Sequence, residues 1–342
     1  MTDTEKIENC DVAIIGSGPS GLAAATLLKQ SGIQQVVVLE RESEAGGIPR
    51  HCGHPPFGIR EFQRVLTGPK YAKKNVETAQ NAGVNIALKT TVTMLGTGGK
   101  LSIVSPEGAK VLIAKRILLA TGTRETPRSA RMVSGSRALG ICTTGALQSM
   151  VYLKNQIPFR RPVVIGTEIV SFSALLTCRN AGIKPVAMLE EKRRPHVRWP
   201  IYELTRWFGV PLLLQTGIVN ILGNERVEAV QISDENGKVR EIVCDGVLFT
   251  GQYTPESSLV RVSHLEFDPE TNSPVVDEFG RCSDPTYYAA GNVVQASRNQ
   301  AKVPVFYTAE NFPNPVDDAG QCWSQGRTTA KNIAKDLSGS LP

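Results

Sequence analysis

The sequence contains no closely spaced pair of cysteines. Its seven cysteines, at positions 10, 52, 142, 178, 244, 282 and 322, are widely scattered and never form a Cys-x-x-Cys pair. This spacing gives neither a zinc ribbon nor an iron–sulfur cluster, and it excludes a redox-active disulfide between near neighbours. A reduced, cytoplasmic chain is the simplest interpretation.

Long apolar runs and concentrated positive charge are also missing. No apolar run approaches the length that crosses a membrane, and the polar start MTDTEKIENC leaves no room for a signal peptide. The net charge of +6 over 342 residues is mild, and no basic tract is interleaved with aromatic residues. We therefore expect no transmembrane segment and no nucleic-acid partner. A composition of 41% hydrophobic and 20% charged residues is typical of a soluble globular protein with room for two domains.

The strongest positive signal lies between Val12 and Glu40, VAIIGSGPSGLAAATLLKQSGIQQVVVLE. An apolar strand precedes the glycines, an apolar helix follows them, and a second strand predicted at 36–39 is followed by Glu40. In such a unit Gly16 makes the tight turn, Gly18 lets a pyrophosphate approach the backbone, and Gly21 lets the helix pack on the strand. The helix N-terminus favours the anion, and the acid accepts hydrogen bonds from a ribose diol. This pattern predicts a dinucleotide site.

A loop rich in glycine and proline follows Glu40, and we expect a shaped loop there rather than a helix. Gly46 and Gly47 again allow backbone to lie close to a ligand. His51, Cys52 and His54 suggest a metal site, but no fourth ligand has a supporting spacing. We therefore interpret this segment as lining a cofactor and predict no metal.

Further elements are expected on both sides of the middle of the chain. A helix is predicted from about Tyr71 to Ala82, and a buried strand ends at Thr121 and Gly122, where backbone can lie against a nucleotide. The segment 127–137 resembles a linker. Near the end, YYAAGNVV at 287–294 reads as a strand, and a helix with helically spaced apolar residues is predicted from Asp317, a candidate N-cap, to Leu337.

The first unit is repeated at an offset of 150 residues. Gly16 corresponds to Gly166 and Glu40 to Glu190, and between them the sequence predicts strands at 163–165 and 186–189 and a helix at 169–180. The later strands recur as well, ending in LFTG as the first set ends in LATG. The pattern predicts an α/β protein with two Rossmann-like dinucleotide-binding domains, the second inserted into the first. We place the first domain at 1–135 and 275–342 and the second at 145–260.

The two copies differ in the phosphate loop. Glu168 stands where the first copy has Gly18, and Ser171 stands in place of Gly21. A carboxylate about 4 Å from a pyrophosphate, at an effective dielectric near 20, costs roughly 4 kcal/mol, or about a thousandfold in affinity. We therefore expect weak or absent nicotinamide binding in the second unit.

A basic run follows the acid of the second unit. It comprises Lys192, Arg193, Arg194, His196 and Arg198. At this place an NADP 2′-phosphate is often held, but the run could equally hold another adenine nucleotide, contact an acidic partner or be a solvated loop. A second adenine nucleotide in the 160–200 region stays an open alternative.

Taken together, these motifs resemble the two-dinucleotide-fold, pyridine nucleotide-disulfide oxidoreductase-like flavoproteins that include thioredoxin reductases and NADH oxidases. The motifs are GSGPSG, Glu40, the glycine pair at 46 and 47, LLATG at 118–122 and AAGN at 289–292. The resemblance implies FAD, with Val92 at the adenine. Asn292 stands where the family usually has an Asp that bonds the ribityl chain. The residues implied to contact FAD are Gly16, Gly18, Pro19, Ser20, Gly21, Glu40, Arg41, Gly46, Gly47, Ile48, His51, Val92, Ala120, Thr121, Gly122, Gly291 and Asn292.

A closer resemblance rests on GGIPRHCGHPPFG, LTGPKYA, TGTRETPR, TTGALQ and CWSQGR. These segments are similar to the α subunits of hydrogen cyanide synthase, octopine and nopaline oxidases and dye-linked proline or hydroxyproline dehydrogenases. In those complexes a β flavoprotein oxidises the substrate, and electrons pass through the α subunit to an acceptor. Many such α subunits carry a cysteine-rich cluster domain, which this sequence lacks. The resemblance thus implies that any iron–sulfur centre lies on another subunit, such as a small iron–sulfur subunit, or is absent.

Three functions follow from these observations. The first is an FAD-containing electron-transfer subunit of a hetero-oligomeric amino-acid or amine dehydrogenase or oxidase, of the opine, proline/hydroxyproline or glycine type. It explains the lack of a cysteine pair, the altered second phosphate loop and the lack of an evident catalytic acid–base pair. The second is a free-standing NAD(P)H-dependent flavin reductase, favoured by the basic run and opposed by Glu168. The third is a non-catalytic nucleotide-binding scaffold subunit. No catalytic residue can be named from the sequence.

Overall fold

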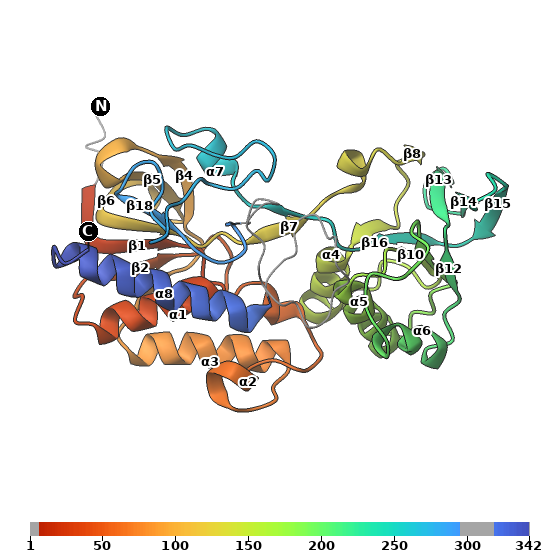
Figure 1. The fold of residues 1–342 in the computed structure, drawn as a ribbon, viewed down its shortest axis with the longest axis horizontal. Coiled ribbons are helices and arrows are strands. Elements are labelled where there is room, and N and C mark those ends of the chain that lie inside the picture. Colours follow the sequence, from red (N-terminus) through yellow and green to blue (C-terminus); the bar gives the residue numbers. More distant parts are fainter. Residues whose placement is uncertain (1–6, 295–317, 342) are drawn as a thin grey trace.

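Two sheets, a mixed one and a parallel one, each with helices packed on it, form the frame of the protein (Figure 1). The computed structural model describes residues 7–294 and 318–341. The first unit is built from both ends of the chain, and the second unit is built from its middle. This arrangement confirms the predicted α/β class with one Rossmann-like unit inserted into the other.

The first sheet has the strand order β3-β2-β1-β6-β5-β4, with β18 also paired to β6. Strands β1, β2, β3, β6 and β18 are parallel, whereas β4 and β5 form antiparallel pairs. Because β18 returns to this sheet after the whole second sheet, the second unit interrupts the first. The strands are β1 (Ile7–Ile15), β2 (Val36–Leu39), β3 (Asn85–Ala87), β4 (Thr91–Leu95), β5 (Lys100–Ser105), β6 (Gly108–Leu119) and β18 (Tyr287–Ala289).

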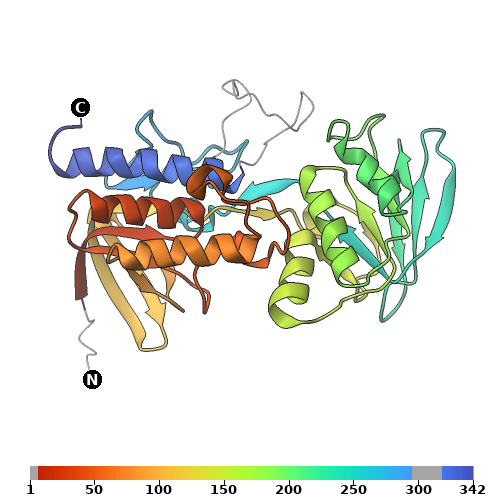
Figure 2. The same cartoon turned by 90° about the horizontal axis from the view of Figure 1, so that it is seen from below.

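The alternation of side chains along β1 explains how this sheet is covered. Val12 and Ile14 join a core with α1 (Pro19–Gln30) and α8 (Ala319–Leu337). Ala13 and Ile15 face the other way, into a core with the β4–β5 hairpin. Helix α3 (Gly68–Asn81) also packs on α1, so that three helices lie side by side on one face (Figure 2).

The second sheet is wholly parallel, with the order β12-β11-β10-β16-β9. A mostly antiparallel sheet of order β15-β14-β13-β8 lies beside it, with β8 parallel to β13. The strands are β8 (Ser134–Gly135), β9 (Ile141–Thr143), β10 (Pro162–Ile165), β11 (Ala187–Glu190), β12 (Leu212–Leu214), β13 (Gly217–Leu222), β14 (Ala229–Ser233), β15 (Val239–Val243) and β16 (Gly246–Phe249). The helices are α4 (Thr144–Gln148), η4 (Ser149–Leu153), α5 (Ile169–Asn180), η5 (Ile201–Glu203) and α6 (Leu204–Trp207).

A two-stranded antiparallel ribbon of β7 (Thr123–Glu125) and β17 (Tyr253–Pro255) links the two units (Figure 1). The short helices outside the second unit are η1 (Ile48–His51), α2 (Ile59–Phe62), η2 (Thr97–Gly99), η3 (Arg128–Arg131) and α7 (Ser258–Arg261). Within the described residues, no helix is long and apolar enough to cross a bilayer.

Most predicted elements are confirmed, and the differences lie at turns and helix ends. The strand at 36–39 and the helix at 169–180 have the predicted bounds, whereas the helix predicted at 71–82 begins three residues earlier, at Gly68. The expectation of a loop without helix after Glu40 is wrong, because η1 and α2 lie there. The linker predicted at 127–137 also contains η3 and β8. Short helical turns of three or four residues give too weak a periodicity to be seen in the sequence.

The N-cap of the last helix differs from the prediction. Asp317 lies outside the described residues, and Asp318 caps α8. Its carboxylate accepts the N–H of Gln321 at 2.7 Å, and the Gln321 side chain accepts the N–H of Asp318 at 2.9 Å. A reciprocal capping box needs Gln or Glu at the third helical position. With Asp318 as the N-cap, Gln321 occupies that position.

Candidate functional site

The turn between β1 and α1 is shaped by three glycines. Gly16 has φ +106°, and a β-carbon there would lie 2.5 Å from the carbonyl oxygen of Ala120. A β-carbon on Gly21 would lie 2.0 Å from the carbonyl oxygen of Gly16, so the helix packs directly on the turn. Around Gly18, in contrast, no described atom lies within 4 Å of the place of a β-carbon. The backbone of Gly18 therefore faces open space at the start of α1, where an anion is favoured.

Two further loops border this turn. Gly47 has φ +63°, and its β-carbon would lie 2.7 Å from the Cα of Gly18. Gly291, with φ +78°, packs against Ser20, whose Cβ would lie 2.9 Å from an added β-carbon. The Ser20 hydroxyl is buried and has no hydrogen-bond partner among the described residues. An unpartnered buried hydroxyl beside an uncrowded backbone fits the pyrophosphate of a dinucleotide.

Glu40 is held rigidly at the carboxyl end of β2. Its carboxylate accepts the N–H and the hydroxyl of Ser17 and the N–H of Glu42, the last at 2.9 Å. Its backbone carbonyl accepts the N–H of Thr90 at 2.8 Å, which ties the segment before β4 to the site. Although Glu40 is 7% exposed, each carboxylate oxygen retains lone pairs that a ribose hydroxyl can use.

The other residues implied by the resemblance are spread around these loops. Ala120 is buried beneath Gly16, the Thr121 hydroxyl donates to the carbonyl of Glu256 at 2.7 Å, and a β-carbon on Gly122 would meet open space. Two side chains are less enclosed. Arg41 is 66% exposed and Ile48 49% exposed. Four more of the implied residues remain to be placed. Pro19 lies in the first turn of α1, and Gly46 lies against Ala72. Val92 belongs to the same core as Leu39, and Asn292 is half-buried after β18.

The second phosphate loop repeats the first in backbone and in its acid. Gly166 has φ +107°, close to the value at Gly16. The Thr167 hydroxyl donates to Glu190, as Ser17 does to Glu40, and Glu190 likewise accepts the N–H two residues on, from Lys192, at 3.0 Å. The two phosphate loops, 150 residues apart in the sequence, therefore share individual hydrogen bonds as well as the backbone conformation of their first glycine.

Glu168 makes the second loop different from the first. One carboxylate oxygen accepts the N–H of Gln252 at 3.1 Å, and a β-carbon on Gly251 would lie 1.9 Å from the other. The equivalent space beside Gly122 in the first unit is open. Burial raises the pKa of Glu168 to about 7, against the opposing hydrogen bond from Gln252. The side chain thus lies across the place that a nucleotide phosphate needs.

The basic run splits into an inward and an outward part. The His196 Nδ1 lies 3.0 Å from a carboxylate oxygen of Glu190. Burial opposes ionisation of Glu190, but the hydrogen bonds from His196 and Thr167 outweigh it and lower its pKa. The other members, Lys192, Arg193, Arg194 and Arg198, are exposed.

The residues of the loop that suggested a metal contact different partners. The Cys52 thiol donates to Gln148 Oε1 at 3.5 Å, whereas the His54 Nε2 pairs with the Ser173 hydroxyl at 2.5 Å. In the described part of the chain, no three His, Cys, Asp or Glu side chains are arranged to hold a metal. This loop instead joins the first unit to α4 and α5 of the second.

Sequence reasoning missed Glu125, Gln148 and Tyr253 in this region. Glu125 ends β7 only three residues after Gly122, and Tyr253 lies opposite it on β17. Gln148 lies at the end of α4, beside Cys52. Glu125 and Gln148 lie in TGTRETPR and TTGALQ, two segments that carried the closer resemblance and were the usable signal for them, whereas Tyr253 had no such signal.

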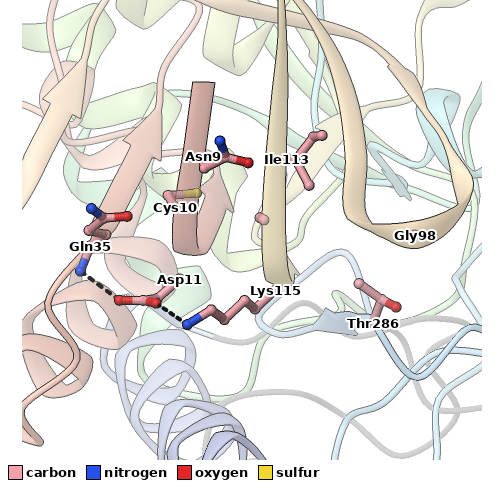
Figure 3. A pocket seen from close by; sticks show the side chains of 9 residues that line it. Asn9, Cys10, Asp11, Gln35, Gly98, Ile113, Lys115 and Thr286 are labelled. Carbon is pink, nitrogen blue, oxygen red and sulfur yellow. Dashed lines mark hydrogen bonds and ion pairs between the residues drawn. The ribbon is translucent and has the colours of Figure 1, made fainter. Parts of the chain in front are cut away.

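A surface pocket of about 420 Å³ lies at the other end of β1 (Figure 3). Within it the Asp11 carboxylate accepts the N–H of Gln35 at 2.9 Å and pairs with the Lys115 Nζ at 2.8 Å. The hydrogen bond from Lys115 lowers the pKa of Asp11. Ligands of open α/β sheets bind at the carboxyl ends of the strands, whereas Asn9, Cys10 and Asp11, which line this pocket, lie within the first five residues of β1. The pocket is therefore separate from the candidate site.

Comparison with known proteins agrees with this geometry. Residues 10–311 match the family described as pyridine nucleotide-disulphide oxidoreductase. The chain belongs to this family. Its members are FAD-dependent oxidoreductases whose fold includes an NAD(P)-binding domain, so the chain is an oxidoreductase with FAD as its cofactor.

Several relatives in this oxidoreductase family are subunits of larger enzymes. The A subunit of opine oxidase from Agrobacterium tumefaciens (strain Ach5) is 26% identical over 313 residues, which cover 82% of this chain and 61% of the relative. The alpha subunit of sarcosine oxidase from Rhizobium meliloti (strain 1021) is 21% identical over 263 residues, covering 72% of this chain and 25% of the relative. The chain thus spans less than two thirds of these relatives' own length.

A solved structure shows the same fold. The crystal structure of T. acidophilum thioredoxin reductase superposes with a TM-score of 0.75 at 23% identity, covering 97% of this chain and 99% of the other. At this identity the likeness supports the two-domain fold and says nothing further of activity.

Proposed function

We propose that this chain is the FAD-containing electron-transfer (α) subunit of a heteromeric amino-acid or amine dehydrogenase or oxidase, of the opine, proline/hydroxyproline or glycine type. A flavoprotein β subunit oxidises the substrate, and electrons pass through this chain to an acceptor. The similarity to the opine oxidase and sarcosine oxidase subunits supports this role. A small iron–sulfur subunit is a further proposed partner, and the proposed location is cytoplasmic, which suits seven cysteines without a disulfide.

The observation that carries the proposal is the position of Glu168. A reductase that takes electrons from NAD(P)H needs a second dinucleotide beside the flavin. Here a carboxylate lies against Gly251 and Gln252, in the place that is open beside Gly122 in the first unit. Because the Glu168 side chain crowds the second loop where a phosphate would lie, electrons are better supplied by a partner protein.

We propose that the first unit binds FAD through the residues implied by the resemblance. When bound, FAD supplies the redox chemistry. Gly16, Gly18 and Gly21 bring the backbone and the N-terminus of α1 to the pyrophosphate, the Ser20 hydroxyl gains a partner there, and Glu40 holds the ribose diol. We further propose an FAD-binding domain at 1–135 and 275–342 and a second, degenerate nucleotide-fold domain at 145–260.

A second candidate function is a free-standing NAD(P)H-dependent flavin reductase. It is favoured by Lys192, Arg193, Arg194 and Arg198, which are exposed next to the acid of the second unit and suit a 2′-phosphate or another adenine nucleotide. It is opposed by Glu168 and by His196, which already engages Glu190.

Co-expression with the products of neighbouring genes tests the proposal. The FAD-loaded chain alone should not reduce a dye with amines or amino acids, whereas the reconstituted complex should. Anaerobic addition of stoichiometric NADPH to the chain should leave the visible flavin absorbance unbleached. Amine-dependent dye reduction by the chain alone, with no gain from a partner, would contradict the subunit role. Bleaching of the flavin absorbance by NADPH would support the NAD(P)H-dependent reductase. Bound FAD that neither a donor nor a partner reduces would indicate a non-catalytic scaffold.

A further inference from the structure

A group of polar side chains lies where the ribbon and η1 of the first unit meet α4 of the second. Glu125 and His51 approach Gly145 on the first turn of α4. A β-carbon on Gly145 would lie 3.5 Å from the Oε2 of Glu125 and 4.0 Å from the Cε1 of His51. The carboxyl group and the imidazole therefore face one point from two segments that are far apart in the sequence.

The hydrogen bonds of Gln148 determine the tautomer of His51. The Nε2 of Gln148 donates to the hydroxyls of Ser173 at 2.8 Å and Thr177 at 3.4 Å, so both amide hydrogens are used. Its carbonyl oxygen, which also accepts the Cys52 thiol, is the Gln148 atom left to interact with His51. The imidazole can approach this oxygen only as a donor, so that its Nδ1, which is buried and has no partner among the described residues, carries the lone pair.

Glu125 presents a complementary group. Its Oε2 accepts the N–H of Gly145 at 2.7 Å, whereas its Oε1 is buried without a hydrogen bond from any described residue. Burial raises the pKa of Glu125, and the N–H of Gly145 and the neighbouring hydroxyls of Thr144 and Thr143 oppose this shift only in part. Glu125 Oε1 and His51 Nδ1 are thus two buried polar atoms, unpartnered among the described residues, whose side chains both approach Gly145.

Burial lowers the pKa of His51 and raises that of Glu125, and Glu168, with a pKa of about 7, is a further titratable group nearby. Burial raises the pKa of Cys52 and of Cys142 to about 12, so both thiols stay neutral. Arg131 is the nearby cation that opposes the shift of Glu125. The titratable groups that face Glu125 from the elements around it are His51, Cys52, Arg131, Cys142, Glu168 and Tyr253.

We propose that Glu125 and His51 form a proton site coupled to the redox state of FAD, which takes up one proton from solvent when two electrons arrive on the cofactor. The inference rests on the proposed FAD site, since His51 follows Ile48 and Glu125 follows Gly122, both proposed contacts. The two electrons come from the partner protein or from a chemical reductant. One proton from solvent binds the free lone pair of His51 Nδ1, where the Glu125 carboxylate stabilises the positive charge. On reoxidation this proton returns to solvent.

Redox titration of bound FAD in the isolated chain tests this site. When one proton is taken up with every two electrons, the equilibrium constant for reduction of FAD changes tenfold per pH unit. For a two-electron couple this corresponds to about 30 mV in midpoint potential per pH unit. We expect Glu125→Gln and His51→Gln each to lose one proton's share of the slope of midpoint potential against pH. His264→Asn is the matched control, because His264 pairs with Asp284 at 2.9 Å beside Tyr287 and away from the proposed site; it should keep the wild-type slope.

The outcome does not depend on a partner, so it is separate from the test of the subunit role. Unchanged slopes in both variants, with FAD retained, would overturn the proton site. If Glu125→Gln loses FAD, Glu125→Asp is measured in its place. This variant should keep the slope of midpoint potential against pH, but the pH range over which that slope holds should move. A pH range identical to that of the wild type would also overturn the proposal.

Discussion

Gly18 and Glu168 occupy the same position in two loops that share their backbone. Gly16 and Gly166 have nearly the same positive φ, and both loops tie a hydroxyl to the acid that ends the second strand. The difference of one side chain leaves the first loop open and places a carboxylate across the second. At the scale of the residue, this exchange underlies our proposal that the first loop, and not the second, binds a dinucleotide.

Transferring the glutamate to the first loop should abolish the cofactor site. We expect Gly18→Glu to weaken FAD binding about a thousandfold, because a carboxylate about 4 Å from the pyrophosphate costs roughly 4 kcal/mol. The flavin absorbance per purified chain, and the Kd from reconstitution of the apoprotein, measure this. Gly18→Ala is the control for crowding without charge, and it should fold normally because its β-carbon meets no described atom within 4 Å. Full flavin content in Gly18→Glu would contradict the assignment.

The titration of Glu168 should make stability depend on pH. Since its folded-state pKa is about 7 and its ordinary value is 4.5, the unfolded chain releases this proton more readily. The favourable contribution is complete below the unfolded-state pKa and is lost as pH rises through this window. We expect Glu168→Gln to gain about 1 to 3 kcal/mol relative to the wild type between pH 5 and pH 8. Urea unfolding at several pH values measures the difference.

An exposed glutamate provides the comparison for this pH dependence. Glu278 lies in an exposed turn, and Glu278→Gln should show a nearly constant stability difference from the wild type across the same range. A constant difference for Glu168→Gln as well would show that its carboxyl is not perturbed.

At the scale of the element, a small residue lets α8 approach α1 closely. A β-carbon on Gly326 would lie 2.1 Å from the carbonyl oxygen of Ser20. The two helices therefore approach to backbone contact just where α1 begins. This contact fixes Ser20, and with it the start of the proposed FAD site.

Gly326→Ala should consequently destabilise the protein. In an exposed helix this change stabilises by up to about 1 kcal/mol, but here the added methyl forces the helices apart, and we expect a loss of about 1 to 3 kcal/mol in the free energy of unfolding. Ser324→Ala, on the exposed face of α8, is the control and should change stability by less than about 0.5 kcal/mol. A stabilised Gly326→Ala variant would mean that the helices do not touch here.

At the scale of the whole molecule, the loop after η1 connects the two units. A β-carbon on Gly53 would lie 2.2 Å from the ring of Tyr152, and His54 pairs with Ser173 on α5. The loop that begins at the proposed FAD site therefore also sets the position of the second unit. Cofactor binding and the relative placement of the units share these residues.

A double-mutant cycle can measure this contact. Gly53→Val should lower the free energy of unfolding by about 1 to 3 kcal/mol through overpacking against Tyr152. Tyr152→Ala removes the obstructing ring, so the double variant should be more stable than the sum of the single changes predicts, by about 0.5 to 3 kcal/mol. Urea unfolding of the four proteins measures the coupling, and strict additivity would contradict the contact.

Much of the fold could be predicted because its signals are local. The strand at 36–39 and the helix at 169–180 follow from apolar runs bounded by glycines, and the offset of 150 residues reveals two similar units. The order of strands could not be predicted in the same way, because pairing such as that of β18 with β6 joins residues about 170 positions apart. Short turns such as η1 and α2 carry too few residues for a periodicity.

The sequence alone determined that this protein has two nucleotide folds and that the second lacks a phosphate-loop glycine, because turns and charges are encoded in neighbouring residues. It left open whether Glu168 turns away from the site. Only the tertiary structure decided that its carboxylate packs against Gly251 and accepts the N–H of Gln252. The tertiary structure also decided that Glu125 and His51 both approach Gly145. These contacts depend on how distant segments pack, and their energies come from burial and hydrogen-bond geometry that no local pattern encodes.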